Sequence, residues 1–151
     1  MREIAISACL LGTNCRYNGE IKRDDRLIEM LDGLELVPFC PEDYCYGTPR
    51  PSMDLIETAE GIEAYSNATG EKLSAPLRHY AQAFFEQHPD IELFIGKDRS
   101  PSCGVKSAKV YDPSKTLRST HGRGVMAEEA EAYGIPTIDA EQFALSEEAL
   151  S

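Results

Sequence analysis

Short apolar runs alternate with segments of helical periodicity along most of this sequence, and the alternation narrows the possible folds more than any other feature. Four apolar runs are typical of buried strands, and they cover residues 3–10, 34–39, 91–95 and 135–138. Apolar residues at helical spacing predict helices over 26–31, from Ser74 to a residue before Pro89, over 124–133 and over 141–150. A strand, a helix and a strand in succession form a βαβ unit, which favours a parallel sheet with a right-handed crossover. We therefore predict an α/β fold with a Rossmann-like, mostly parallel sheet flanked by helices.

Turn and cap signals add detail to this topology. Residues 53–57 and 62–65 flank Gly61 and predict a small β-hairpin insertion, because glycine allows the positive φ that such turns often need. Ser74 is expected to act as the N-cap of the long helix, and the polar stretch after the third strand is expected to be a loop. The chain has 151 residues, which fits a single domain over 1–151.

Charge and hydropathy argue against several classes of protein. No apolar run approaches the roughly 20 residues that a membrane helix needs. The first residues turn polar too soon for a signal peptide, so we expect a cytoplasmic protein. The net charge is −11, and a surface of this sign repels phosphate backbones, which argues against a binder of duplex nucleic acid. A small neutral or weakly acidic ligand meets less of this barrier, although acidity can also serve solubility alone.

The cysteines are the residues most informative about function. There are five, so they cannot all pair within one chain, and without a secretory signal we expect them to be reduced. Cys9 follows the first predicted strand, Cys40 and Cys45 follow the second, and Cys103 follows the third. The carboxyl ends of parallel strands meet at one edge of a sheet, where ligands bind in such folds. The topology therefore predicts that thiols from distant parts of the chain gather at one site.

The spacing of these cysteines bears on the metal. Zinc sites usually contain cysteines two to four residues apart, often with histidine. Cys9 and Cys15 are too far apart for this pattern, Cys40 and Cys45 are marginal, and the histidines are not grouped. Thiolate ligation without paired cysteines favours an iron–sulfur cluster. Three thiolates would leave one iron open, as a Lewis-acid catalyst requires.

Two alternatives from other functional classes stay open at this point. A cluster-bearing electron carrier or sensor needs four protein ligands, and Cys15 or Cys40 could supply the fourth. A zinc-stabilised binding module would have no catalytic activity.

Five short motifs, in this order, resemble a bacterial family that was long described only as a domain of unknown function and is now associated with thiouracil desulfurase (desulfidase). The motifs cover the first two-thirds of the chain, and they are Ser7-Ala8-Cys9-Leu10-Leu11-Gly12, Cys15-Arg16-Tyr17-Asn18-Gly19, Pro38-Phe39-Cys40-Pro41-Glu42, Thr48-Pro49-Arg50-Pro51 and Ser100-Pro101-Ser102-Cys103-Gly104.

The resemblance implies a 4Fe–4S cluster held by three cysteines. By motif position the implied ligands are Cys9, Cys45 and Cys103, with Cys40 and Cys15 as alternates. The fourth iron would then take the sulfur of the substrate.

The resemblance also implies an activity, the non-redox desulfuration of a thiolated nucleobase of the 2-thiouracil type to the oxo base and sulfide. Glu42 and Ser100 would be the catalytic pair, with Glu42 activating the water that attacks the thiocarbonyl carbon. The expected partner is a small-molecule thiolated base, and a monomer and a homodimer are both compatible with the sequence.

Candidate substrate-binding residues are Ser102, Arg50 and Tyr17. Arg50 could bind an oxygen of the substrate or simply pair with one of the many acidic residues. Tyr17, Tyr44 and Tyr46 could stack on a flat base or only pack in the fold.

Overall fold

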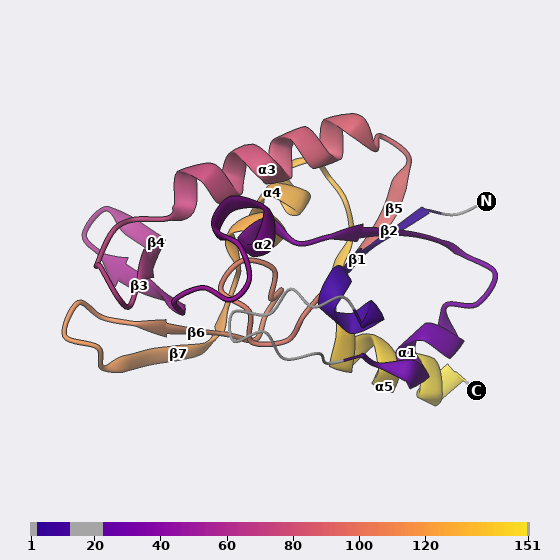
Figure 1. Cartoon of the computed structure of the whole chain (residues 1–151). Helices are drawn as coiled ribbons and strands as arrows, with labels where there is room; N and C mark the ends of the chain where they lie inside the picture. Colours follow the sequence, from indigo (N-terminus) through magenta and orange to yellow (C-terminus); the bar gives the residue numbers. More distant parts are fainter. Residues whose placement is uncertain (1–2, 13–22, 151) are drawn as a thin grey trace.

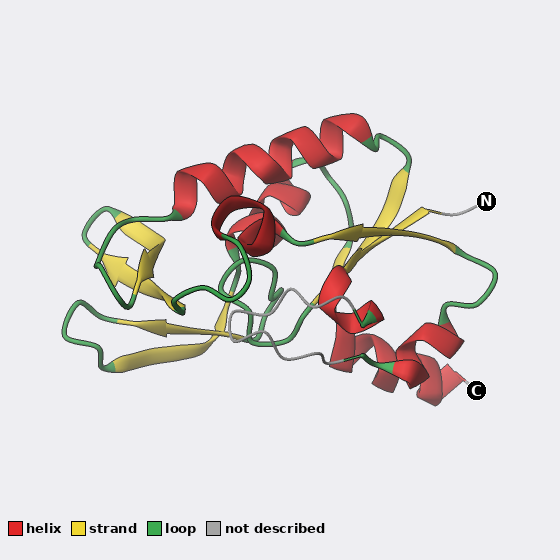
Figure 2. Cartoon of the chain, viewed as in Figure 1, coloured by secondary structure: helices red, strands yellow, loops and turns green. Residues whose placement is uncertain are grey.

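The computed structural model describes residues 3–12 and 23–150, with the backbone alone for 146–150. Figures 1 and 2 show the arrangement of its elements. In chain order the elements are β1 (Glu3–Ser7), the short 3-10 helix η1 (Ala8–Leu11), α1 (Asp25–Met30), β2 (Glu35–Phe39), α2 (Pro41–Tyr46), β3 (Met53–Thr58), β4 (Gly61–Ser66), α3 (Ser74–Gln87), β5 (Ile91–Gly96), β6 (Ala108–Tyr111), β7 (Leu117–Gly122), α4 (Val125–Ala132), β8 (Thr137–Asp139) and α5 (Ala140–Leu150).

The predicted parallel sheet is present. Among the described residues, β2, β1, β5 and β8 lie side by side in this order, and every neighbouring pair is parallel; we call this sheet A. Pro38 lies in β2 at the edge of the sheet, level with Ile6 of β1, where proline removes the fewest ladder hydrogen bonds. The α/β fold class predicted from the sequence is confirmed.

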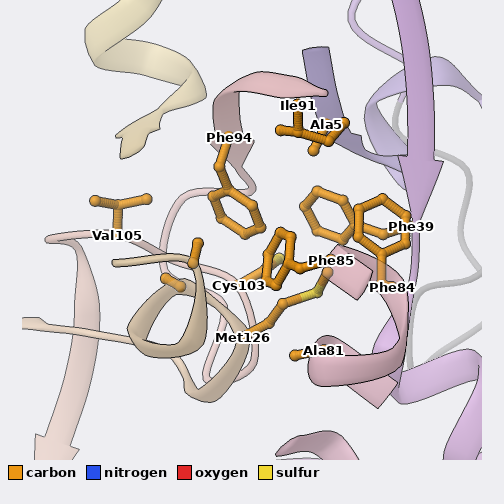
Figure 3. Close-up of a cluster of buried hydrophobic side chains, with 12 residues drawn as sticks. Ala5, Phe39, Ala81, Phe84, Phe85, Ile91, Phe94, Cys103, Val105 and Met126 are labelled. Carbon is orange, nitrogen blue, oxygen red and sulfur yellow. The ribbon is translucent and has the colours of Figure 1, made fainter. Parts of the chain in front are cut away.

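Helices cover both faces of sheet A because apolar residues occupy both faces of its strands. On one face, Ala5 and Phe94 pack with aromatic and small side chains of α3 and α4, and Figure 3 shows the rings of Phe39, Phe84 and Phe85 meeting there. The planes of Phe39 and Phe94 are stacked with centroids 4.7 Å apart. On the other face, the opposite alternation directs isoleucines of β1 and β5 towards α1 and the start of α5.

A second sheet was only partly predicted. The expected hairpin is β3 and β4, with Gly61 at φ +119° in its turn. β3 also pairs in parallel with β6, and β6 pairs antiparallel with β7, so that within the described chain the order is β4, β3, β6, β7; we call this sheet B. The prediction that the stretch after β5 is only a loop was wrong. β6 does alternate buried Ala108 and Val110 with exposed Lys109, but it is four residues long, and β7 is almost entirely exposed.

Helix α3 packs against both sheets. Its Leu77 lies in the apolar cluster of sheet B, and its Phe84 and Phe85 lie in that of sheet A. In Figure 1 the helix runs along the top of both sheets. Ser74 is its first residue rather than its N-cap, because the Ser74 hydroxyl accepts a hydrogen bond from the backbone N–H of Ala64 at 2.8 Å. The start of α3 is therefore fixed to β4.

Two further differences from the sequence prediction affect the cysteines. The first strand ends at Ser7, and Cys9 lies in η1 rather than at the end of a longer strand. Cys40 is the N-cap residue of α2 and Cys45 lies within that helix, so both belong to a helix and not to a loop. Pro41 at the first position of α2 favours this outcome, because its fixed φ suits a helix start. Among the described residues, no helix is long and apolar enough to cross a membrane.

The segment that carries Cys103 lies directly against the backbone of its neighbours. A Cβ atom added to Gly96 would lie 1.9 Å from the carbonyl oxygen of Cys103, and one added to Gly124 would lie 2.6 Å from the Cys103 nitrogen. The backbone N–H groups of Val125 and Met126, at the start of α4, donate to the carbonyls of Pro101 and Ser102. The end of β5 and the start of α4 therefore hold this segment from two sides.

We predict that Gly96→Ala destabilises the protein, because the carbonyl of Cys103 is backbone and cannot move without shifting its whole segment. Overpacking of this kind typically costs about 1–3 kcal/mol. The measurement is the midpoint of urea unfolding, with Glu86→Ala on the exposed surface of α3 as the control. An unchanged midpoint for Gly96→Ala would mean that the close approach is not a feature of the protein.

Candidate active site

A cavity of about 780 Å³ lies at the carboxyl-end edge of sheet A. Its wall is formed by the end of β1, the start of α2, the start of β3, the segment from the end of β5 to Cys103 and the start of α5. Residues that line it include Ser7, Cys9, Cys40, Glu42, Arg50, Met53, Asp54, Asp98, Ser100, Ser102, Cys103 and Glu141. The cavity thus lies where the strand order predicts a ligand site, and it takes residues from both sheets.

Three of the four described cysteines line this cavity, which agrees with the convergence predicted from the strand ends. They are Cys9, Cys40 and Cys103. Cys45 is not among the lining residues; it is partly buried and packs against the apolar cluster of sheet B. Cys15 and Tyr17 lie outside the described residues.

The thiol of Cys103 is the most deeply buried of the group. Burial is the main reason that its pKa is raised to about 12, and the nearby Cys9 thiol acts in the same direction. A hydrogen bond from Ser100 and another from the backbone of Lys97 act in the opposite direction, because they favour the thiolate. Cys9 in turn lies 3.1 Å from the hydroxyl of Ser7. Both thiols therefore have hydrogen-bonding partners suited to a charged sulfur.

The cysteines of α2 lie close to each other and to Glu42. Burial raises the pKa of Cys45, and the charges of Cys40 and Glu42 raise it further. Glu42 and Cys45 are three residues apart on a helix, which makes them neighbours on its surface. Glu42 also contributes to the raised pKa of Cys103, and its carboxylate accepts a hydrogen bond from Ser102 in the segment that carries Cys103.

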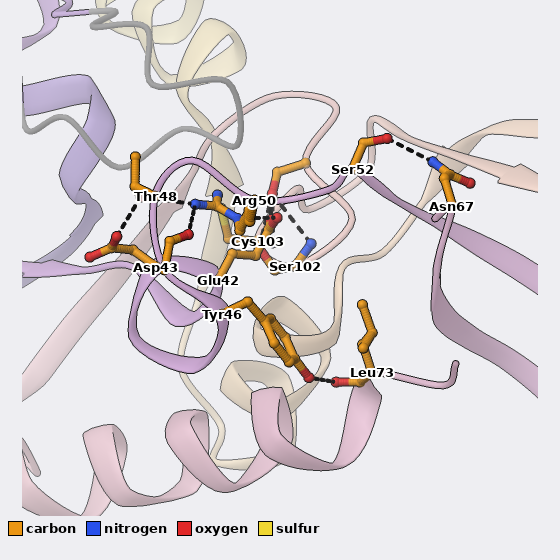
Figure 4. A network of polar contacts seen from close by, with 12 residues as sticks. Glu42, Asp43, Tyr46, Thr48, Arg50, Ser52, Asn67, Leu73, Ser102 and Cys103 are labelled. Carbon is orange, nitrogen blue, oxygen red and sulfur yellow. Dashed lines mark hydrogen bonds and ion pairs between the residues drawn. The ribbon is translucent and has the colours of Figure 1, made fainter. Parts of the chain in front are cut away.

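Glu42 has hydrogen-bonding partners on both of its carboxylate oxygens (Figure 4). The hydroxyl of Ser102 donates to Oε2 at 2.5 Å, whereas the hydroxyl of Ser100 lies 3.5 Å from the same oxygen. Ser100 Oγ also accepts hydrogen bonds from the backbone N–H groups of Ser102 and Cys103, at 3.3 and 3.2 Å. Of the two serines, Ser102 is therefore the closer partner of Glu42, and Ser100 shapes the turn that presents both Ser102 and Cys103.

Arg50 lies on the other side of the Glu42 carboxylate. Its Nε is 3.4 Å from Glu42 Oε1, and its side chain is only 5% exposed, against 12% for Glu42. Its Nη1 donates to the Gly47 carbonyl at 3.0 Å and to the Thr48 hydroxyl at 3.1 Å. The sequence left open whether Arg50 pairs with an acidic residue, and the structure shows that it does.

The tyrosines considered as stacking residues differ in their surroundings. The Tyr46 hydroxyl donates to the carbonyl of Leu73 at 2.7 Å, which ties α2 to the start of α3. Tyr44 is largely exposed and packs against the ring of Tyr80. The backbone N–H of Cys40 donates to the Tyr80 hydroxyl at 3.1 Å, so Tyr80 fixes the backbone at the start of α2.

Sequence reasoning missed two buried carboxylates beside the cavity. Asp139, at the end of β8, accepts hydrogen bonds from the backbone N–H groups of Val105 and Lys106, at 2.7 and 2.8 Å. Asp98 accepts one from the N–H of Glu141 at 2.9 Å, and burial raises the pKa of Asp98. An aspartate directly after an apolar strand was the signal that could have identified Asp139.

The arrangement of the thiols bears on the kind of metal centre. Among the residues that the structure describes, no three or more Cys, His, Asp or Glu side chains are grouped closely enough to hold a single metal ion. An iron–sulfur cluster distributes its cysteine ligands over several iron atoms, and three thiols around one cavity suit that arrangement.

Comparison with known proteins identifies the family. The model of the family described as 2-thiouracil desulfurase matches residues 4–142. The chain belongs to this family. The five motifs had predicted this membership, which is confirmed.

Two similar proteins show how much of the chain is shared with relatives. A protein of Bacillus subtilis named "Uncharacterized protein YbbK" is 29% identical over 132 residues, which cover 82% of this chain and 86% of the relative. A solved structure named "[4Fe-4S]-dependent thiouracil desulfidase TudS" is 26% identical, with a TM-score of 0.75 over 99% of this chain and 98% of the other. The α/β architecture is therefore shared along nearly the whole of both chains.

Proposed function

We propose that this chain is a thiouracil desulfurase that holds a 4Fe–4S cluster in the cavity at the edge of sheet A. The observation that carries the proposal is that Cys9, Cys40, Cys103 and Glu42 line one cavity in a chain of this family. The similar solved structure is that of a protein named for the same cluster and the same activity. Because residues of both sheets line the cavity, we propose that residues 1–151 act as one desulfurase domain.

Two of the proposed ligands are Cys9 and Cys103, and helix α2 provides the third. The resemblance to the family favours Cys45 for the third position. The cavity wall instead includes Cys40, which makes Cys40 the alternate from the described residues. Cys15 is the other alternate, from the part of the chain that the structure does not describe.

A cluster held by three protein ligands would supply an open iron, a Lewis acid suited to the sulfur of a thiocarbonyl group. The chain itself has to deliver water to the thiocarbonyl carbon and to accept its proton. Glu42 is the candidate base, since it is a cavity-lining carboxylate beside the proposed ligands. No net electron transfer is needed, because water replaces sulfide at the same carbon and leaves a carbonyl group.

The serines beside Glu42 have separate tasks in this proposal. Ser102 donates to Oε2 and fixes the plane of the carboxylate, while Oε1, which faces Arg50 Nε, keeps a second lone pair for water. Ser100 stabilises the turn that holds Ser102 and Cys103, and its hydroxyl lies close enough to orient water or a ring atom of the substrate. The volume of about 780 Å³ is in the range of small-molecule sites.

The first prediction concerns the cluster. Protein purified without oxygen is expected to contain iron and acid-labile sulfide in near-equal amounts, because a 4Fe–4S cluster contains as many sulfide ions as iron ions and is held through thiolates on its iron. Metal analysis and a labile-sulfide assay measure this directly. Protein that takes up zinc alone and no labile sulfide under anaerobic reconstitution would favour a non-catalytic zinc module instead.

The second prediction concerns the third ligand. Cys9→Ser and Cys103→Ser are each expected to lose most of the iron, because each removes a proposed ligand that lines the cavity. Because the resemblance to the family favours Cys45 as the third ligand, Cys45→Ser is expected to lose the cluster and Cys40→Ser is expected to retain much of it. Iron per protein is measured after identical reconstitution, with the two α2 variants as matched controls for each other. Full iron in Cys45→Ser and low iron in Cys40→Ser would make Cys40 the ligand.

The third prediction concerns Glu42. Glu42→Gln is nearly isosteric, so iron content and substrate binding should stay largely intact, while turnover of 2-thiouracil falls by roughly two to four orders of magnitude. Glu57→Gln, on an exposed position of β3, is the control and should match the parent chain. Iron and turnover are measured on the same sample. A fully loaded Glu42→Gln protein with parental turnover would refute the role of Glu42 as base.

A further inference from the structure

The guanidinium of Arg50 is committed to the protein on the side that faces α2. Its Nε faces Glu42 Oε1, and its Nη1 donates both to the Gly47 carbonyl and to the Thr48 hydroxyl. The Thr48 hydroxyl in turn donates to the carboxylate of Asp43 (Figure 4). Glu42 and Asp43 lie in the first turn of α2, and Gly47 and Thr48 follow its end. Arg50 therefore connects the start of this short helix to the segment that follows it.

Burial makes this contact more than a surface ion pair. The Arg50 side chain is 5% exposed and that of Glu42 is 12% exposed. Screening by water is weak at such a site, and a charged group left there without its partner is costly. The Nε–Oε1 distance of 3.4 Å is long for a charge-assisted hydrogen bond. Arg50 therefore contributes to the orientation of the Glu42 carboxylate rather than one strong hydrogen bond.

The two partners of Glu42 hold different oxygens of its carboxylate. Ser102 approaches Oε2 from the segment that carries Cys103, and Arg50 approaches Oε1 from the segment after α2. A carboxylate held at both oxygens has a fixed plane and a fixed rotamer. This is the condition for a base that must face one carbon of a bound ring, because small errors in position reduce rate strongly.

We infer that Arg50 is a positioning residue that acts through Glu42, rather than a residue that binds the substrate. The inference rests on the proposed function, since it assigns a role within the same site. The two roles that the sequence left open for Arg50 have different kinetic signatures. Loss of substrate binding by Arg50 would raise KM, whereas loss of the positioning of Glu42 would lower kcat.

The experiment compares Arg50→Gln with the parent enzyme after both are loaded with the cluster, and it reports kcat per bound iron and KM for 2-thiouracil. We expect kcat to fall by about 10- to 100-fold, with KM within about twofold of the parent value. Arg78→Gln is the matched control, because Arg78 forms a partly buried pair with Glu63 outside the cavity, and its kcat should be unchanged.

Thr48→Val tests the same idea without removing the guanidinium. It takes away one acceptor of Arg50, so kcat should fall by a smaller factor in the same direction, with KM again unchanged. This variant also covers the case in which Arg50→Gln fails to fold. In a Glu42→Gln background, Arg50→Gln should change the residual kcat by less than about twofold, because its effect passes through the carboxylate.

Three results would overturn the inference. The first is a raised KM with parental kcat in Arg50→Gln. The second is a kcat of the double variant that equals the product of the two single losses, and the third is activity that falls only in proportion to iron, with kcat per iron unchanged. A parent enzyme with full cluster and no thiouracil turnover would instead refute the proposed function itself, so the two failures are distinguishable.

Discussion

The parallel pairing of β1 with β2 on one side and β5 on the other is the constraint on which the site depends. The register places Ser7 level with Phe39, and Ile6 level with Ile95, so the three strands end at nearly the same height. Cys9 and Cys40 follow the ends of β1 and β2 almost directly, and the segment that leaves β5 leads to Cys103. Because this register also sets which face each apolar side chain occupies, a slip would disturb the packing of sheet A and the thiol arrangement together.

Most of the arrangement of strands and helices could be predicted from the sequence, because it depends on the periodic spacing of apolar residues. The strands of sheet A and the helices α3 and α4 follow from repeated burial of apolar residues, which is a local pattern. The gathering of cysteines follows from strand order, and the family motifs follow from residue identity. β7 lacked any such signal, since Arg118, Thr120 and His121 are all exposed and its pairing comes from β6 rather than from burial.

Side-chain directions within the site could not be predicted in the same way. Cys40 and Cys45 have different contacts because Cys40 caps α2 and Cys45 lies within it. A helix of six residues has too few apolar positions for its periodicity to be detected in the sequence. Ser100 and Ser102 differ because the Ser100 oxygen accepts hydrogen bonds from N–H groups of its own turn, and Ser102 is the closer donor to Glu42. Both distinctions arise from local backbone geometry, and residue type alone does not determine that geometry.

The far ends of the two hairpins lie away from the cavity, whereas β3 begins at its wall. The turn between β3 and β4 is exposed at Ala59 and Glu60, and the turn between β6 and β7 is exposed over 113–116. Neither turn contributes a residue to the cavity lining. Evolution can therefore lengthen these tips, or graft another module onto them, while the chemistry at the other end of the strands stays undisturbed.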